Sequence, residues 1–219
     1  MSLKIDAQGL KPNVSQQIIS PMFDRNKEWR EAGERTFLSG RVLISMPGIE
    51  DPRFERSIIY LCVHTPDQAM GVTLNRPVEG VTLADVLKTL EIPLISDAGP
   101  APVLIGGPVE RERGFVLHTD DYLSETATLP VANGVSMTAT REVLQAIGGD
   151  SGPRRSILAL GYAGWGPGQL EQELRDNVWL TCEADEDLLF DPNPNDKWSK
   201  ALAKIGVHAS SLSGQTGQA

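Results

Sequence analysis

Residues 156–171, SILALGYAGWGPGQLE, contain one complete unit of the fold that the sequence predicts. The aliphatic run Ser156–Leu160 is typical of a buried strand. The closely spaced glycines that follow predict a tight turn over Gly161–Gly168. Pro167 suits the first turn of a helix, where a proline loses no helical hydrogen bond, so we expect a helix that continues to Asp176.

Similar signals along the rest of the chain predict further strands and helices. The other predicted strands are short apolar or β-branched runs: Arg41–Met46, Ser57–Val63, Met70–Leu74, Val103–Ile105, Gly114–His118, Gly134–Met137 and Val178–Cys182. The other predicted helices are bounded by capping residues or by glycines: Thr82–Leu90, Arg141–Ile147 and Lys197–Ile205. Strands come in clusters with single helices between them, which predicts an α+β fold with a mixed or antiparallel sheet.

The 219 residues fit one domain with a sizeable core. Residues 1–36 are polar and lack a sustained period, so we predict an N-terminal extension there, a domain over residues 37–208 and a C-terminal tail over residues 209–219. We expect the extension to pack on its own domain or on a second copy, which makes a homo-oligomer one alternative. Its candidate anchors are its apolar residues: Ile18, Ile19, Phe23 and Trp29.

The sequence favours a cytoplasmic location. It has no run of about 20 apolar residues that could span a bilayer, and no basic start followed by an apolar stretch that would indicate a signal peptide. Cys62 and Cys182 each lie inside an apolar, strand-like run, which is typical of reduced core thiols.

Acidic residues exceed basic ones by 29 to 20, which gives a net charge of −9. They are concentrated between Glu171 and Asp196, where nine acidic residues face Arg175 alone. This run predicts an acidic surface, which would repel phosphate backbones and acidic membranes. A solvated face that aids solubility is the simpler interpretation of the same run.

Four segments punctuated by glycine and proline carry a family resemblance: Leu43–Phe54 (LISMPGIEDPRF), Ala69–Pro77 (AMGVTLNRP), Gly106–His118 (GGPVERERGFVLH) and Gly161–Glu171 (GYAGWGPGQLE). From about Phe37 to Val207 the chain resembles the YqgE/AlgH family of bacterial proteins. The resemblance implies one compact domain with a strongly bent, branching sheet surrounded by helices. The family has no established biochemical activity, and its name comes partly from a proposed regulator of exopolysaccharide synthesis.

The predicted glycine-rich turn is a candidate phosphate site, because backbone N–H groups at a helix start can hold an anion. Three features oppose this: Pro167 removes one donor, Glu171 and Glu173 add negative charge, and the spacing matches no nucleotide-binding motif. The alternative is a turn whose glycines let Trp165 pack.

A metal site would need Cys62 and His64 to meet His118 and Asp120, which requires their two strands to be neighbours. The pattern Asp191-x-Asn193-x-Asn195 lacks the glycine and the glutamate of a calcium loop. We therefore predict no metal and no cofactor.

Asn75-Arg76-Pro77 offers a guanidinium that could clamp a carboxylate or a phosphate, although a turn with Arg76 paired to a local acid explains it equally simply. The candidate binding residues are the polar and aromatic side chains of the family-like turns: Asn75, Arg76, His118, Trp165, Gln169 and Glu171. If these side chains meet, they could line a cleft.

The residues favour a binding or interaction module, with an unrecognised enzyme or a small-ligand or metal-binding protein as the alternative. No nucleophile elbow and no catalytic cysteine context is present. The negative charge argues against specific binding of duplex DNA, although Arg111, Arg113, Arg154 and Arg155 could form a local basic patch. A regulatory role would then act through a protein partner or an unknown small molecule, and we expect no membrane association.

Overall fold

The computed structural model describes residues 38–95, 101–125 and 127–212, so the predicted extension over residues 1–36 lies outside them. The strands are β1 (Arg41–Ser45), β2 (Ile58–His64), β3 (Ala69–Thr73), β4 (Pro77–Thr82), β5 (Pro102–Ile105), β6 (Val109–Thr119), β7 (Thr128–Ala132), β8 (Val135–Thr138), β9 (Ser156–Trp165) and β10 (Trp179–Glu183). The helices are η3 (Pro52–Phe54, a 3-10 helix), α3 (Leu83–Thr89), α4 (Arg141–Gly148), α5 (Gln169–Arg175), α6 (Glu186–Leu189), α7 (Lys197–Lys204) and α8 (Ala209–Leu212).

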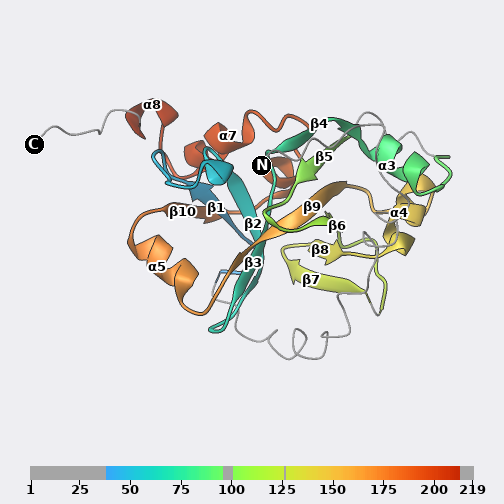
Figure 1. Cartoon of the computed structure of the whole chain (residues 1–219), viewed down its shortest axis with the longest axis horizontal. Coiled ribbons are helices and arrows are strands. Elements are labelled where there is room, and N and C mark those ends of the chain that lie inside the picture. The colour runs from blue at the N-terminus through green and yellow to red at the C-terminus, as the bar shows by residue number, and fades with distance from the viewer. Residues whose placement is uncertain (1–37, 96–100, 126, 213–219) are drawn as a thin grey trace, which may run out of the picture.

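Strand β9 is the point at which the sheet branches. Its first half pairs with β5 in parallel, with Leu104 opposite Ala159, and its second half pairs with β3 in antiparallel, with Ala69 opposite Trp165. β6 lies along its other side, and the main path runs β10-β1-β2-β3-β9-β6-β8-β7. Figure 1 shows β9 crossing the centre between these two groups of strands. The predicted α+β class and the bent, branching mixed sheet are confirmed.

The prediction of a turn over Gly161–Gly168 is wrong for its first half, which continues β9 as far as Trp165. The glycines serve a close crossing of main chains instead. A Cβ atom on Gly106 would lie 2.2 Å from the carbonyl oxygen of Gly161, and one on Gly107 would lie 2.0 Å from the carbonyl carbon of Tyr162. Two of the family-like segments therefore meet backbone to backbone, an approach that residues with side chains cannot make.

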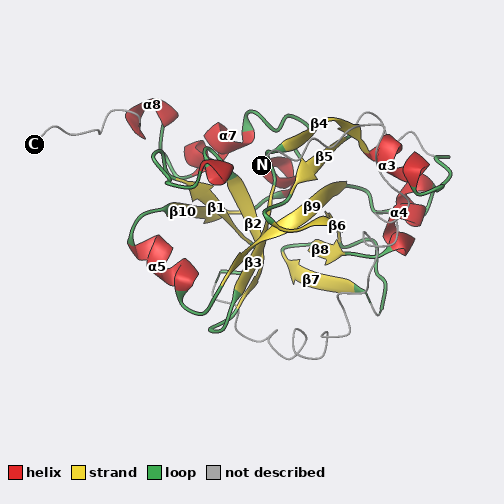
Figure 2. Ribbon diagram, in the orientation of Figure 1, coloured by secondary structure: helices red, strands yellow, loops and turns green. Residues whose placement is uncertain are grey.

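Strands β1 and β2 are buried on both faces. Val42 and Ile44 point into a cluster with Trp198 of α7, whereas Leu43 points into another with Leu170 of α5. The period-2 alternation of a strand sends successive side chains to opposite faces, and here both faces are apolar. A third cluster packs α3 and α4 against β6 and β9. Figure 2 shows the helices arranged around the sheet.

Several elements differ from the prediction. β4 and β7 are strands that the sequence analysis does not include. Pro77 is the first residue of β4 and Pro130 lies in the edge strand β7, positions at which a proline is tolerated. α6 and α8 were also not predicted, and α8 lies at the start of the predicted tail. Helix α5 begins at Gln169 rather than at Pro167, after Gly168 with a φ of 70°. The predicted capping box of Thr82 and Asp85 is confirmed at α3.

No helix among the described residues is long and apolar enough to cross a membrane.

Candidate functional site

Three of the predicted binding residues, Trp165, Gln169 and Glu171, come together at the start of α5. Trp165 and Gln169 share a neighbour, Glu173, which the sequence did not single out. One oxygen of Glu173 accepts hydrogen bonds from the indole N–H of Trp165 at 2.8 Å and from that of Trp179 at 2.7 Å. Its other oxygen accepts from the side-chain amide of Gln169 at 2.9 Å. These contacts fasten α5 to the ends of β9 and β10.

Glu171 lies on the same helix and pairs with His64 at the end of β2. The distance between His64 Nε2 and Glu171 Oε1 is 2.8 Å, and His64 is buried. The backbone N–H of Glu171 lowers the pKa of its own carboxyl, burial opposes this, and the hydrogen bond with His64 lowers it further. We interpret the pair as a second attachment of α5 to the sheet.

Asn75 and Arg76 lie elsewhere and hold the loop around η3. Asn75 Oδ1 accepts from the Ile58 N–H at 2.9 Å, and its amide donates to the Arg56 carbonyl at 2.8 Å. Arg76 Nε donates to Ser57 Oγ at 3.2 Å, and its Nη2 donates to main-chain carbonyls of the same loop. The predicted alternative named a local acid as the partner of Arg76. That partner is wrong, because the guanidinium donates to a hydroxyl and to main-chain carbonyls.

His118 is fully buried on β6 and belongs to a chain of hydrogen bonds. Its Nδ1 is 2.8 Å from the Thr119 carbonyl oxygen, which can only accept, so Nδ1 carries the proton. In a neutral ring Nε2 then accepts from Thr138 Oγ1 at 2.9 Å, and Thr138 in turn accepts from Thr128 at 2.8 Å. Thr128 Oγ1 accepts from the backbone N–H of Ser124 at 2.9 Å. The hydroxyls of Thr138 and Thr128 therefore each donate to one fixed partner and accept from another.

The metal hypothesis fails on topology. β2 carries Cys62 and His64, β6 carries His118, and the sheet places β3 and β9 between these strands. Within the described ranges, no group of three or more His, Cys, Asp or Glu residues could hold a metal ion. Burial raises the pKa of the Cys62 thiol, and neither cysteine forms a disulfide.

The acidic run does not form the continuous acidic surface that its sequence predicts, because basic residues from distant parts of the chain pair with it. Arg41 pairs with Glu183, Lys204 with Asp185, and Lys200 with Asp191. Glu186 pairs with Arg154 at 2.8 Å and lies 3.8 Å from Arg155. The run therefore connects α6 and α7 to the sheet.

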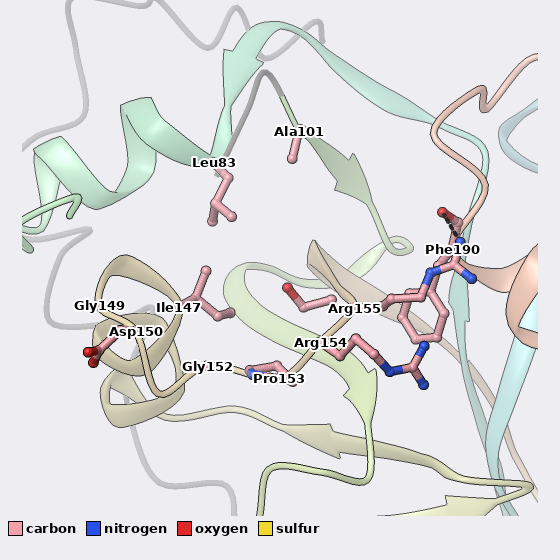
Figure 3. A pocket seen from close by; sticks show the side chains of 11 residues that line it. Leu83, Ala101, Ile147, Gly149, Asp150, Gly152, Pro153, Arg154, Arg155 and Phe190 are labelled. Carbon is pink, nitrogen blue, oxygen red and sulfur yellow. Dashed lines mark hydrogen bonds between the residues drawn. The ribbon is translucent and has the colours of Figure 1, made fainter. Parts of the chain in front are cut away.

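A pocket of about 450 Å³ lies at a different place, between α3, the end of α4 and the start of β9. Figure 3 shows Leu83, Ala101 and Ile147 on one part of its wall, with Arg154, Arg155 and Phe190 on the side away from Gly149 and Asp150. None of the six predicted binding residues lines it. The signal that could have indicated it is the segment Gly149–Arg155, GDSGPRR, which joins α4 to β9 and supplies much of the lining.

Comparisons with known proteins relate the sequence and the fold of this chain to one protein family. The profile of a family described as AlgH-like matches residues 42–210. A UPF0301 protein of Caulobacter vibrioides is 60% identical over 184 residues, which cover 84% of this chain and 94% of that protein. The solution structure of the AlgH protein from Pseudomonas aeruginosa superposes with a TM-score of 0.66 at 43% identity, covering 85% of this chain and 98% of that one. A crystal structure from Corynebacterium diphtheriae, 24% identical, shares the fold with a TM-score of 0.62 over 78% of this chain and 90% of that one.

Proposed function

The chain belongs to the AlgH-like family, and on that premise we propose that it is a binding module whose small ligand occupies the pocket between α3, α4 and β9. The observation that carries the proposal is the pocket itself. Its volume of about 450 Å³ falls in the range of small-molecule sites, and its wall combines apolar residues with a few polar ones.

The lining favours binding over catalysis. Its ionisable side chains are Asp150, Arg154 and Arg155. A guanidinium stays protonated in proteins and cannot serve as a general base. His118, the residue best suited to proton transfer near neutral pH, is fully buried and engaged in its hydrogen-bonded chain. An enzyme remains the alternative hypothesis, and its site would have to be built around Asp150.

We further propose that any regulatory role is indirect and cytoplasmic, with the ligand-bound module acting on a protein partner. The two buried cysteines support a reducing compartment. Among the arginines that could have contacted DNA, Arg113 is buried and pairs with Glu110, and the net charge of −9 opposes the approach of a phosphate backbone.

We therefore predict no specific binding to duplex DNA. A gel-shift titration at about 150 mM salt should show no sequence-selective complex in the nanomolar range, where specific DNA-binding proteins form one. A selective complex at that concentration would contradict the indirect role.

A melting-temperature screen against a broad panel of metabolites tests the binding proposal, because a ligand of the folded state raises its stability. We expect at least one hit, and the variant Ala101→Phe should abolish it by filling the pocket. The matched control is Ala203→Phe, which adds the same ring to the exposed face of α7. A panel without hits, or a hit that survives Ala101→Phe, would contradict a ligand site at this position.

A further inference from the structure

The polar groups of the pocket are distributed unequally, and this distribution bears on the class of ligand. Two guanidinium side chains lie on the Phe190 side, and the one carboxylate among the lining residues belongs to Asp150 on the other side. Leu83 and Ile147 contribute apolar surface between these ends. Resting on the proposed function, we infer that the ligand is a small organic anion with an apolar body, and that Arg154 holds its carboxylate or phosphate group.

The two arginines are not equivalent. Arg155 is held in place, because its Nη2 donates to the Phe190 carbonyl at 3.3 Å and its guanidinium lies 5.4 Å from the centre of the Phe190 ring. Arg154 has a backbone N–H that donates to Asp121 at 2.9 Å, which fixes where its side chain starts. Its guanidinium pairs with Glu186 through Nη2 alone. Since a guanidinium carries five N–H groups, Arg154 can accommodate a second anion.

The pair of Arg154 with Glu186 is exposed, with 59% and 34% of the two side chains accessible. Exposed ion pairs contribute little net stability, so a competing anion can take the place of Glu186 at low cost. A carboxylate or phosphate can bind a guanidinium through two parallel hydrogen bonds. This bidentate, charge-assisted pairing is the strongest contact that the guanidinium can make at neutral pH. Glu186 therefore competes with the ligand's head group for the Arg154 guanidinium.

The apolar part of the lining restricts the ligand further. A second negative charge at the far end of the ligand would lie against Leu83 and Ile147 without a counter-ion, and an unpaired charge in an apolar site is costly. The arrangement therefore favours a monoanionic ligand whose apolar body lies against Leu83 and Ile147, and it disfavours a dianion charged at both ends.

The test uses matched eight-carbon probes with the full-length protein: octanoate, octyl phosphate, neutral octanamide, octylammonium and octanedioate. Binding is followed by the amide NMR shifts of Gly149 and Gly152, which line the pocket. We expect octanoate or octyl phosphate to bind at least about tenfold more tightly than octanamide, the scale of one charge-assisted contact. Octylammonium and octanedioate should bind more weakly than octanoate.

Two variants separate a contact with Arg154 from a general effect on folding. Arg154→Gln should remove the preference for the anion, whereas Glu186→Gln should raise the affinity for octanoate several-fold, because it removes the internal competitor. A structural role for the pair would make both variants weaken binding. Arg53→Gln and Asp51→Asn, which break a comparable exposed pair on the η3 loop, should change neither affinity.

Equal binding of octanoate and octanamide would overturn the anion inference and leave the pocket as a ligand site. The same holds if Glu186→Gln fails to strengthen anion binding. If no probe shifts Gly149 or Gly152 at millimolar concentration, the inference is wrong, and the metabolite screen with Ala101→Phe still decides separately whether the pocket binds anything.

Discussion

At the scale of single residues, the buried polar side chains of this chain are held in fixed arrangements by neighbours that are distant in sequence. His118 and Lys197 are the clearest cases, because each is buried and each has a pKa displaced by its surroundings. Their protonation therefore affects the stability of the fold. The direction follows from comparing the folded pKa with the unfolded one.

His118 should make the protein less stable in acid. Burial lowers its pKa, although the Thr119 carbonyl and nearby acids partly oppose this, so the unfolded chain takes up the proton at a higher pH than the folded chain. The free energy of unfolding should fall as pH drops through about 6.5, with a slope of at most about 1.4 kcal/mol per pH unit from this group. Protonation also makes Nε2 a donor, so the Thr138 hydroxyl then accepts from the ring and its own hydrogen loses its present acceptor.

Urea unfolding between pH 5 and pH 7 checks this prediction, with His118→Gln as the variant that should lose part of the pH dependence. Nitrogen NMR of the ring should show the proton on Nδ1 at neutral pH. Identical pH dependence in the two proteins, or a proton on Nε2, would contradict it.

Lys197 should act in the alkaline range. Burial lowers its pKa from 10.5 to about 8, while its Nζ donates to the Leu189 carbonyl at 2.6 Å. Between these values the unfolded chain holds the proton and the folded chain releases it, so stability from this group increases with pH. The gain is at most about 3 kcal/mol between pH 8 and 10.5.

Lys197→Met should lack this increase when unfolding is compared at pH 7.5 and pH 9.5. Lys200→Met is the matched control, because Lys200 lies on the same helix, is exposed and has its pKa raised by Asp191. If Lys197→Met retains the full increase of the wild type, the explanation by burial is wrong.

At the scale of elements, α5 depends on side-chain contacts more than on its own propensity. It has seven residues, too few for a helix to persist alone in water. Glu173 joins it to Trp165 and Trp179, and Glu171 joins it to His64. These polar residues, which the sequence predicted as possible cleft residues, thus hold a short helix over the core cluster that contains Leu43 and Leu170.

Glu173→Gln should destabilise the protein by about 1–3 kcal/mol, because the negative charge that strengthens both indole contacts is lost and an amide nitrogen in place of Oε1 cannot accept from Gln169. Urea unfolding followed by tryptophan fluorescence measures the loss. Glu112→Gln on the exposed part of β6 serves as the control and should change stability by less than about 0.5 kcal/mol. Equal effects of the two changes would show that Glu173 has no special role.

At the scale of the whole molecule, the ion pairs of the acidic run and the strand pairing of the branching sheet both join segments that are distant in the sequence. Cations from β1, from the segment before β9 and from α7 pair with acids of β10, α6 and the loops on either side of α6. The domain so formed corresponds to the part of the chain that its relatives share. We predict that the N-terminal extension adds to this domain rather than forming it.

Deleting residues 1–30 should therefore leave the domain from Phe37 onward folded, while lowering its melting temperature or weakening its self-association. Ordering a segment costs about 1–2 kcal/mol per residue, so a bound extension must make compensating contacts through Ile18, Ile19, Phe23 and Trp29. Calorimetry and the mass in solution of the two proteins measure the effect. An unchanged melting temperature together with an unchanged mass would contradict a bound extension.

The sequence by itself determined the family, the α+β class and most strands, because these depend on local patterns such as the aliphatic runs of β2 and β3 and the capping box of α3. It also located the segments 106–118 and 161–171 as special. The glycines of residues 161–168 predicted a tight turn, which is wrong for Gly161–Trp165, where β9 continues.

Only the tertiary structure decided what those glycines and polar residues do. In the sequence Gly161 is typical of a turn, but the fold packs Gly106 and Gly107 against its backbone. Glu171 is a candidate binding residue in the sequence, but in the fold its carboxylate pairs with His64. The pocket combines residues of α3, α4, the start of β9, Ala101 and Phe190, and Leu83 and Phe190 are 107 positions apart in the sequence. Local sequence encodes conformation through short-range sterics and hydrogen bonding, whereas contacts between distant segments depend on how the whole chain packs, and the site is made of such contacts.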